Sequence, residues 1–85
     1  MSETSLTLDE LKPGQSATVI EVKAGGLDRR RLMDFGILPG TRIEIELRSP
    51  LGSPTAYRVR GSVIALRTSQ AQQITIEVNN HDDAR

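Results

Sequence analysis

The stretch that decides the fold lies at residues 41–48 and reads Thr41-Arg42-Ile43-Glu44-Ile45-Glu46-Leu47-Arg48. Its apolar side chains, Ile43, Ile45 and Leu47, alternate with charged ones. Because successive side chains of a strand point to opposite faces, this period of two predicts a strand with one buried face and one solvated face. We therefore expect a mainly β protein whose core includes these three apolar residues.

The residues before this strand predict a helix with a defined end. Residues 27–35 favour a short helix, and Asp28 lies near its start, where the helix dipole stabilises negative charge. Gly36 occupies the position at which helices commonly end in a left-handed residue. Leu32 and Ile37 have the spacing of the apolar pair that accompanies such an end. A type II turn is then expected at residues 38–41, which place Pro and Gly at its two central positions.

Four more segments are typical of short strands. Residues 17–23 are rich in β-branched residues, and Ile20 and Val22 are expected to share a face. Further strands begin near Tyr57, Val63 and Ile74, and single helical turns are expected at residues 7–11 and 68–73. Five short strands with one short helix after the first strand predict a small, partly open β barrel. The predicted core positions are Ile43, Ile45, Leu47, Ile74, Ile76 and Val78.

The chain length of 85 residues fits one domain. We assign this domain to residues 7–78. The polar ends, residues 1–6 and 79–85, are expected to be flexible.

The composition excludes several classes of function. The chain has no Cys, and its one His, His81, lies in the polar C-terminal tail, so no catalytic triad, metal site or cofactor is predicted. No phosphate-binding loop of the Walker type is present. The sequence contains no apolar run long enough to cross a membrane and no signal peptide. We therefore predict a non-enzymatic cytoplasmic protein that does not insert into membranes.

The charge balance disfavours nucleic acid as a partner. Eleven basic and eleven acidic side chains cancel, whereas phosphate binding requires a basic excess. Phe35 and Tyr57 are the only aromatic residues, which are too few for a base-stacking platform. A small nucleic-acid-binding β barrel remains the alternative to the leading hypothesis, a module that binds another protein.

The expected protein-binding residues lie on the helix and one loop. Arg and Met are enriched at protein interfaces, and the exposed side of the helix carries both. The loop at residues 50–54 adds an apolar side chain with no evident role in folding. The candidate partner-binding residues are Arg29, Arg30, Met33, Asp34 and Leu51.

Four motifs resemble the FeoA family of bacterial ferrous iron transport proteins. They span residues 8–78. They read Leu8-x-x-Leu11-x-x-Gly14, Arg31-Leu32-x-x-x-Gly36-Ile37-x-Pro39-Gly40, Tyr57-x-Val59-x-Gly61 followed by Ile64-Ala65-Leu66-Arg67, and a final set of Ala71, Ile74 and Val78.

This resemblance implies both a fold and a partner. The fold would be an SH3-like barrel, which agrees with the strands expected from the residues. The partner would be FeoB, a membrane transporter of ferrous iron with a cytosolic GTP-binding domain, which the protein would bind and modulate. The family offers no catalytic residues to transfer to this chain.

Overall fold

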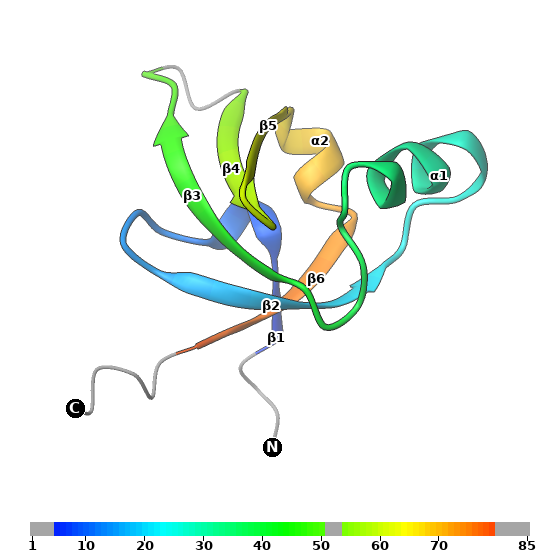
Figure 1. The fold of residues 1–85 in the computed structure, drawn as a ribbon, viewed down its shortest axis with the longest axis horizontal. Coiled ribbons are helices and arrows are strands. Elements are labelled where there is room, and N and C mark those ends of the chain that lie inside the picture. The colour runs from blue at the N-terminus through cyan, green and yellow to red at the C-terminus, as the bar shows by residue number, and fades with distance from the viewer. Residues whose placement is uncertain (1–4, 51–53, 80–85) are drawn as a thin grey trace.

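A computed structural model of the chain describes residues 5–50 and 54–79. Its elements, coloured along the chain in Figure 1, are β1 (Ser5–Thr7), the 3-10 helix η1 (Leu8–Glu10), β2 (Ser16–Val22), α1 (Gly26–Asp34), β3 (Arg42–Arg48), β4 (Thr55–Val59), β5 (Ser62–Leu66), α2 (Thr68–Ala71) and β6 (Ile74–Val78).

The strands form one curved, six-stranded sheet. Its order is β1-β6-β2-β3-β4-β5, and all neighbouring strands are antiparallel. The five predicted strands are present. The sheet also contains a sixth strand that was not predicted, β1, in which Ser5 and Leu6 pair with Glu77 and Ile76. Both residues lie in the N-terminal segment that is expected to be flexible. A three-residue strand with one apolar side chain has no readable period from which to predict it.

The predicted end of the helix is confirmed. Gly36 has φ of +96°, and its amide donates to the Met33 carbonyl at 2.9 Å. The Ile37 amide donates to the Leu32 carbonyl at 3.2 Å, which completes a Schellman motif. Leu32 and Ile37 are both buried in the core. The sequence thus fixes where α1 stops and where the chain turns toward β3.

The predicted alternation fails at two β-bulges. In β2 the register shifts between Val19 and Glu21, so Ile20 is an extra residue and is 42% exposed while Val19 and Val22 are buried. Ile20 and Val22 therefore do not share a buried face. In β3 the register shifts between Ile45 and Leu47, and Leu47 is 68% exposed. A bulge reverses the facing of every later residue in its strand, and for this reason the prediction that Leu47 belongs to the core is wrong.

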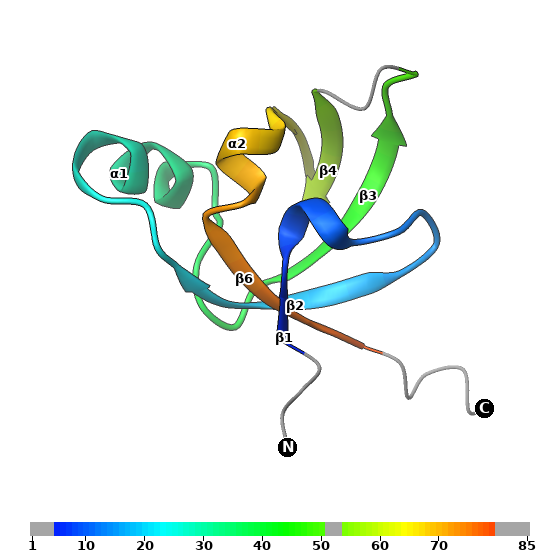
Figure 2. The same ribbon diagram turned by 180° about the vertical axis from the view of Figure 1, so that it is seen from behind.

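The core fills the concave side of the sheet. Ile43, Ile74 and Ile76 are fully buried as predicted, and Ile45 and Val78 are partly buried against them. Leu8 and Ala71 add apolar side chains from η1 and α2. These two short helices contact each other inside the curve of the sheet (Figure 2). Helix α1 lies to the side of the sheet and buries Leu32 only.

Candidate functional site

The exposed side of α1 brings together four of the five predicted partner-binding residues. Arg29, Arg30, Met33 and Asp34 line a shallow hollow of about 290 Å³ together with Gly26. Their spacing of three and four residues places them on neighbouring turns of one helical face. The fifth candidate, Leu51, lies outside the described residues. The helix therefore presents an adaptable Met beside two guanidinium groups and a carboxylate.

Leu27 extends this surface and is missing from the sequence-based set. Its side chain is 77% exposed, the largest exposure among the large apolar residues that the structure describes. It lines a second hollow, of about 190 Å³, with Arg30, Arg31 and Asp34. Leu27 precedes the buried Leu32 by five positions, which is about 140° around a helix of 3.6 residues per turn. This spacing was sufficient to predict that Leu27 faces away from the core.

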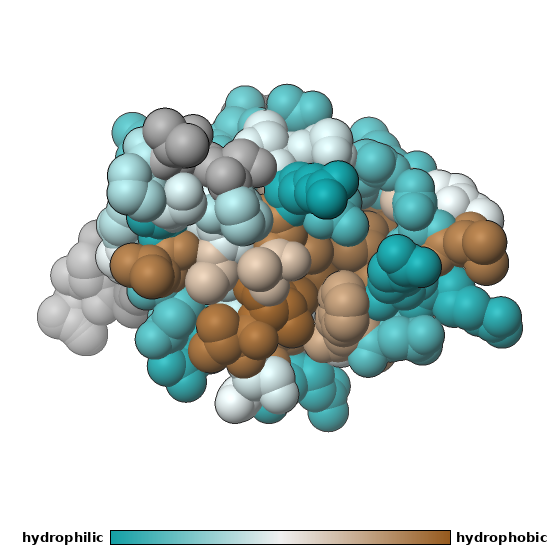
Figure 3. Space-filling view, turned by 90° about the horizontal axis from the view of Figure 1, so that it is seen from above, coloured by the Kyte–Doolittle hydropathy of each residue, from teal (hydrophilic) through white to brown (hydrophobic). Residues whose placement is uncertain are grey.

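A separate apolar surface covers part of the outer face of the sheet. In register, Leu47 lies opposite Ala56, and Ala56 lies opposite Ala65. Val63, two residues before Ala65, is 51% exposed. Figure 3, seen from above the view of Figure 1, shows apolar side chains gathered near the middle of that face of the molecule. This surface shares no residue with the hollows on α1.

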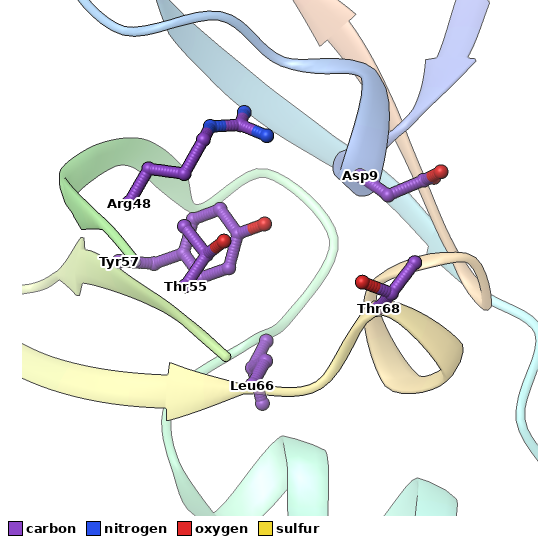
Figure 4. Close-up of a pocket in the computed structure, with 6 residues that line it drawn as sticks. All are labelled: Asp9, Arg48, Thr55, Tyr57, Leu66 and Thr68. Carbon is purple, nitrogen blue, oxygen red and sulfur yellow. The ribbon is translucent and has the colours of Figure 1, made fainter. Parts of the chain in front are cut away.

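A more enclosed cavity lies between η1, the sheet and α2. Its volume is about 140 Å³, and five elements or their ends contribute to it. The lining residues, shown in Figure 4, are Asp9, Arg48, Thr55, Tyr57, Leu66 and Thr68. Sequence reasoning did not find this cavity, because its residues are scattered along the chain and form no spaced motif. The bulge in β3 helps to form the cavity, because it turns Arg48 from the predicted outer face of the strand toward the cavity.

Tyr57 is the most strongly buried ionisable group of this cavity. Only 2% of its surface is exposed. Burial raises the pKa of the Tyr57 phenol above its ordinary value of 10.0, because the anion would lose its hydration. A hydrogen bond with the Thr55 hydroxyl and the positive charge of Arg48 act in the opposite direction and lower this pKa by less. The phenol therefore remains protonated at neutral pH and can donate a hydrogen bond.

This pKa shift predicts a loss of stability in alkaline solution. Below pH 10 the phenol is protonated in both the folded and the unfolded chain, so the pKa shift does not change the free energy of unfolding. Above that pH the unfolded chain ionises first and binds fewer protons than the folded chain, so the free energy of unfolding falls with rising pH. Tyr57 is the only Tyr in the chain, so its ionisation can be followed by absorbance at alkaline pH without interference. Tyr57→Phe should remove this contribution to the pH dependence, and an ordinary phenol pKa in the folded chain would contradict the assignment.

Neither a metal site nor a membrane-spanning helix is found in the described parts of the chain. Residues 5–50 and 54–79 contain no group of three or more His, Cys, Asp or Glu side chains that could hold a metal ion. No helix within the same ranges is long and apolar enough to cross a membrane.

Comparison with known proteins identifies the family. The model of the FeoA domain family matches residues 6–78, which is most of the chain and includes every element from η1 to β6. The chain belongs to the FeoA domain family. The resemblance inferred from its sequence motifs is thereby confirmed. The prediction that the chain is not an enzyme is also confirmed, since FeoA proteins are accessory factors of ferrous iron transport.

A relative of this FeoA domain is joined to a transporter in one chain. This relative is the Fe(2+) transport protein A/Fe(2+) transporter FeoB fusion protein of Porphyromonas gingivalis, with 30% identity over 73 residues. The match covers 86% of the present chain but 9% of the fusion protein. The FeoA domain therefore corresponds to a small part of that relative.

Solved structures of FeoA proteins share the fold. The FeoA-like protein of Clostridium acetobutylicum is 38% identical, with a TM-score of 0.82 and coverage of 91% of this chain and 90% of that one. The FeoA of Stenotrophomonas maltophilia, solved in complex with zinc and described as a procaryotic SH3 domain protein, is 30% identical with a TM-score of 0.75. That match covers 85% of this chain and 89% of that chain. The prediction of an SH3-like fold is confirmed.

Proposed function

We propose that this FeoA domain is a cytosolic accessory protein of bacterial ferrous iron uptake, and that it binds and modulates a FeoB-type transporter through the exposed face of α1. The observation that carries this proposal is the Porphyromonas gingivalis relative, in which an FeoA part and FeoB form a single polypeptide. Fusion holds two domains at a high effective concentration, which is favourable for domains that act on each other.

The exposed face of α1 has the properties of a docking surface. Leu27 offers an apolar side chain that the fold does not bury, and Met33 offers a flexible one. Arg29, Arg30 and Arg31 supply planar donors that suit carboxylates. Asp34 is the one acidic residue lining the two hollows, so the surface has a basic excess. The matching surface on the transporter would be acidic with an apolar centre.

Substitutions on α1 are expected to weaken binding strongly without unfolding the domain. Leu27→Asp, Arg30→Glu and Met33→Asp should each weaken binding to the cytosolic GTP-binding domain of the transporter by about tenfold or more, as losses of central interface residues do. The loss should be measured by calorimetry at fixed salt, with GDP and with a GTP analogue. Surface changes of this kind usually shift stability by less than about 0.5 kcal/mol. Leu27→Asp even places an acid in the first helical turn, where the dipole favours it.

Two controls make this test specific. Glu44→Lys reverses a charge on β3, away from α1, and should bind normally. Leu51→Asp should weaken binding less than the helix variants. Helix variants that remain folded and bind at wild-type strength would show that docking occurs elsewhere. Binding to RNA or DNA that weakens steeply with salt would instead support the alternative, a nucleic-acid-binding barrel.

A further inference from the structure

The cavity lined by Arg48 and Tyr57 has the chemistry of an anion site. Figure 4 shows the hydroxyl groups of Tyr57 and Thr68 directed toward each other across the cavity, with the guanidinium of Arg48 above them. The Asp9 side chain points away from Tyr57 in the same view. Its carboxylate accepts a hydrogen bond from the Thr7 hydroxyl. The polar groups on the Tyr57 side of the cavity are thus one guanidinium and hydroxyl groups, all of which can donate hydrogen bonds.

Arg48 keeps much of its binding capacity available. One of its terminal nitrogens donates to the Leu11 carbonyl at 2.6 Å, which fixes the guanidinium in place. Within the described residues it forms no ion pair, unlike Arg58, which pairs with Glu46 at 2.7 Å. A guanidinium has five N–H donors, so further donors remain for a ligand. A fixed cation that forms no ion pair within the described residues favours an anionic ligand in the cavity beside it.

Tyr57 contributes a donor that stays protonated. Its phenol is buried, and burial raises its pKa, so the hydroxyl remains neutral and can donate to an anion. The Thr55 hydroxyl, which is hydrogen-bonded to Tyr57, belongs to the same lining. The cavity therefore combines one cation with neutral hydroxyl groups, a set suited to a single negative charge.

Charge and size narrow the ligand class. The carboxylate of Asp9 also belongs to the lining, and its negative charge opposes a dianion such as phosphate. A volume of about 140 Å³ is close to that of the engineered cavity of roughly 150 Å³ that accepts benzene, a molecule of six heavy atoms. A carboxylate with two to four further heavy atoms matches both limits.

We propose that the cavity between η1, β4 and α2 binds a monocarboxylate group through the Arg48 guanidinium and the Tyr57 hydroxyl. The group can come from a small free carboxylate or from an acidic side chain of another protein. This site shares no residue with the face of α1, so it is independent of the proposed docking on the transporter.

The test is a titration of the isotope-labelled chain at pH 7 and constant ionic strength, followed by amide chemical shifts in NMR spectra. Propionate should cause saturable shifts centred on the cavity residues. Propionamide, which has the same shape without the charge, should cause none. A glutamate blocked at both backbone ends is the second probe: binding of propionate alone identifies a free carboxylate as the ligand, and binding of both identifies an accessible protein side chain.

Variants separate this site from general anion attraction. Arg48→Gln should weaken propionate binding at least tenfold, whereas Arg58→Gln removes an equal charge from the outer face and should leave binding unchanged. Because Arg48 also bonds to Leu11, Tyr57→Phe provides a second variant that keeps the aromatic ring and should weaken binding several-fold. Absence of saturable shifts with either carboxylate, equal binding of propionamide, or unchanged binding in both variants would overturn the proposal.

Discussion

Replacing Ile43 by alanine is expected to lower the free energy of unfolding by about 2–5 kcal/mol, the cost of a cavity at a buried aliphatic site. Replacing Leu47 in the same strand is expected to cost less than about 1 kcal/mol, since the range of strand propensities spans about that much. The sequence places both residues on one face of β3, but Ile43 is fully buried and Leu47 is 68% exposed. The pair therefore tests the bulge directly.

Urea denaturation, followed by far-UV circular dichroism, measures both changes. The midpoint should fall strongly for Ile43→Ala and little for Leu47→Ala, with an unchanged slope for both variants. Ile20→Ala is a second exposed-site control, because Ile20 is the extra residue of the bulge in β2 and is 42% exposed. Comparable losses at Ile43 and Leu47 would mean that the strand keeps an unbroken alternation and that the bulge is absent.

The two bulges explain why strand positions were predicted better than strand faces. Alternation in residues 41–48 correctly located β3, because a period of two is a local property of the chain. A bulge is set by pairing with a neighbouring strand, and no residue in the run Ile45-Glu46-Leu47 marks it as irregular. The consequence extends beyond Leu47, since the reversed facing also brings Arg48 to the cavity.

The two candidate sites differ in predictability for the same reason. The residues on α1 lie within one helix, so the spacing from Arg29 to Asp34 was enough to group them on one face. The cavity requires Asp9, Arg48 and Tyr57 to meet from three separate elements. Such a meeting depends on sheet order and register, which single-sequence patterns do not contain. A site of this kind becomes visible only when the fold is known.

The end of α1 is the feature for which local sequence and tertiary structure agree most closely, and Gly36→Val is expected to be costly there. At φ of +96° a β-branched residue is strained, and the left-handed conformation alone costs about 1–2 kcal/mol for an L-residue. A Cβ at this position would also lie 3.3 Å from the Cδ of Arg60 and 3.6 Å from a methyl carbon of Val59. We expect a total loss of about 1–3 kcal/mol.

Gly36→Asn distinguishes strain from crowding. Both variants introduce a Cβ against Arg60, but Asn tolerates the left-handed region, so Gly36→Asn should cost clearly less than Gly36→Val in urea denaturation. If crowding were the main cause, the two variants would lose similar stability, and Arg60→Ala would restore both. Since Gly36 directs the chain from α1 into the turn before β3, Gly36→Val should also displace the exposed face of the helix. Its binding to the transporter domain should then weaken more than its loss of stability alone accounts for, whereas Gly36→Asn should bind nearly as the wild type.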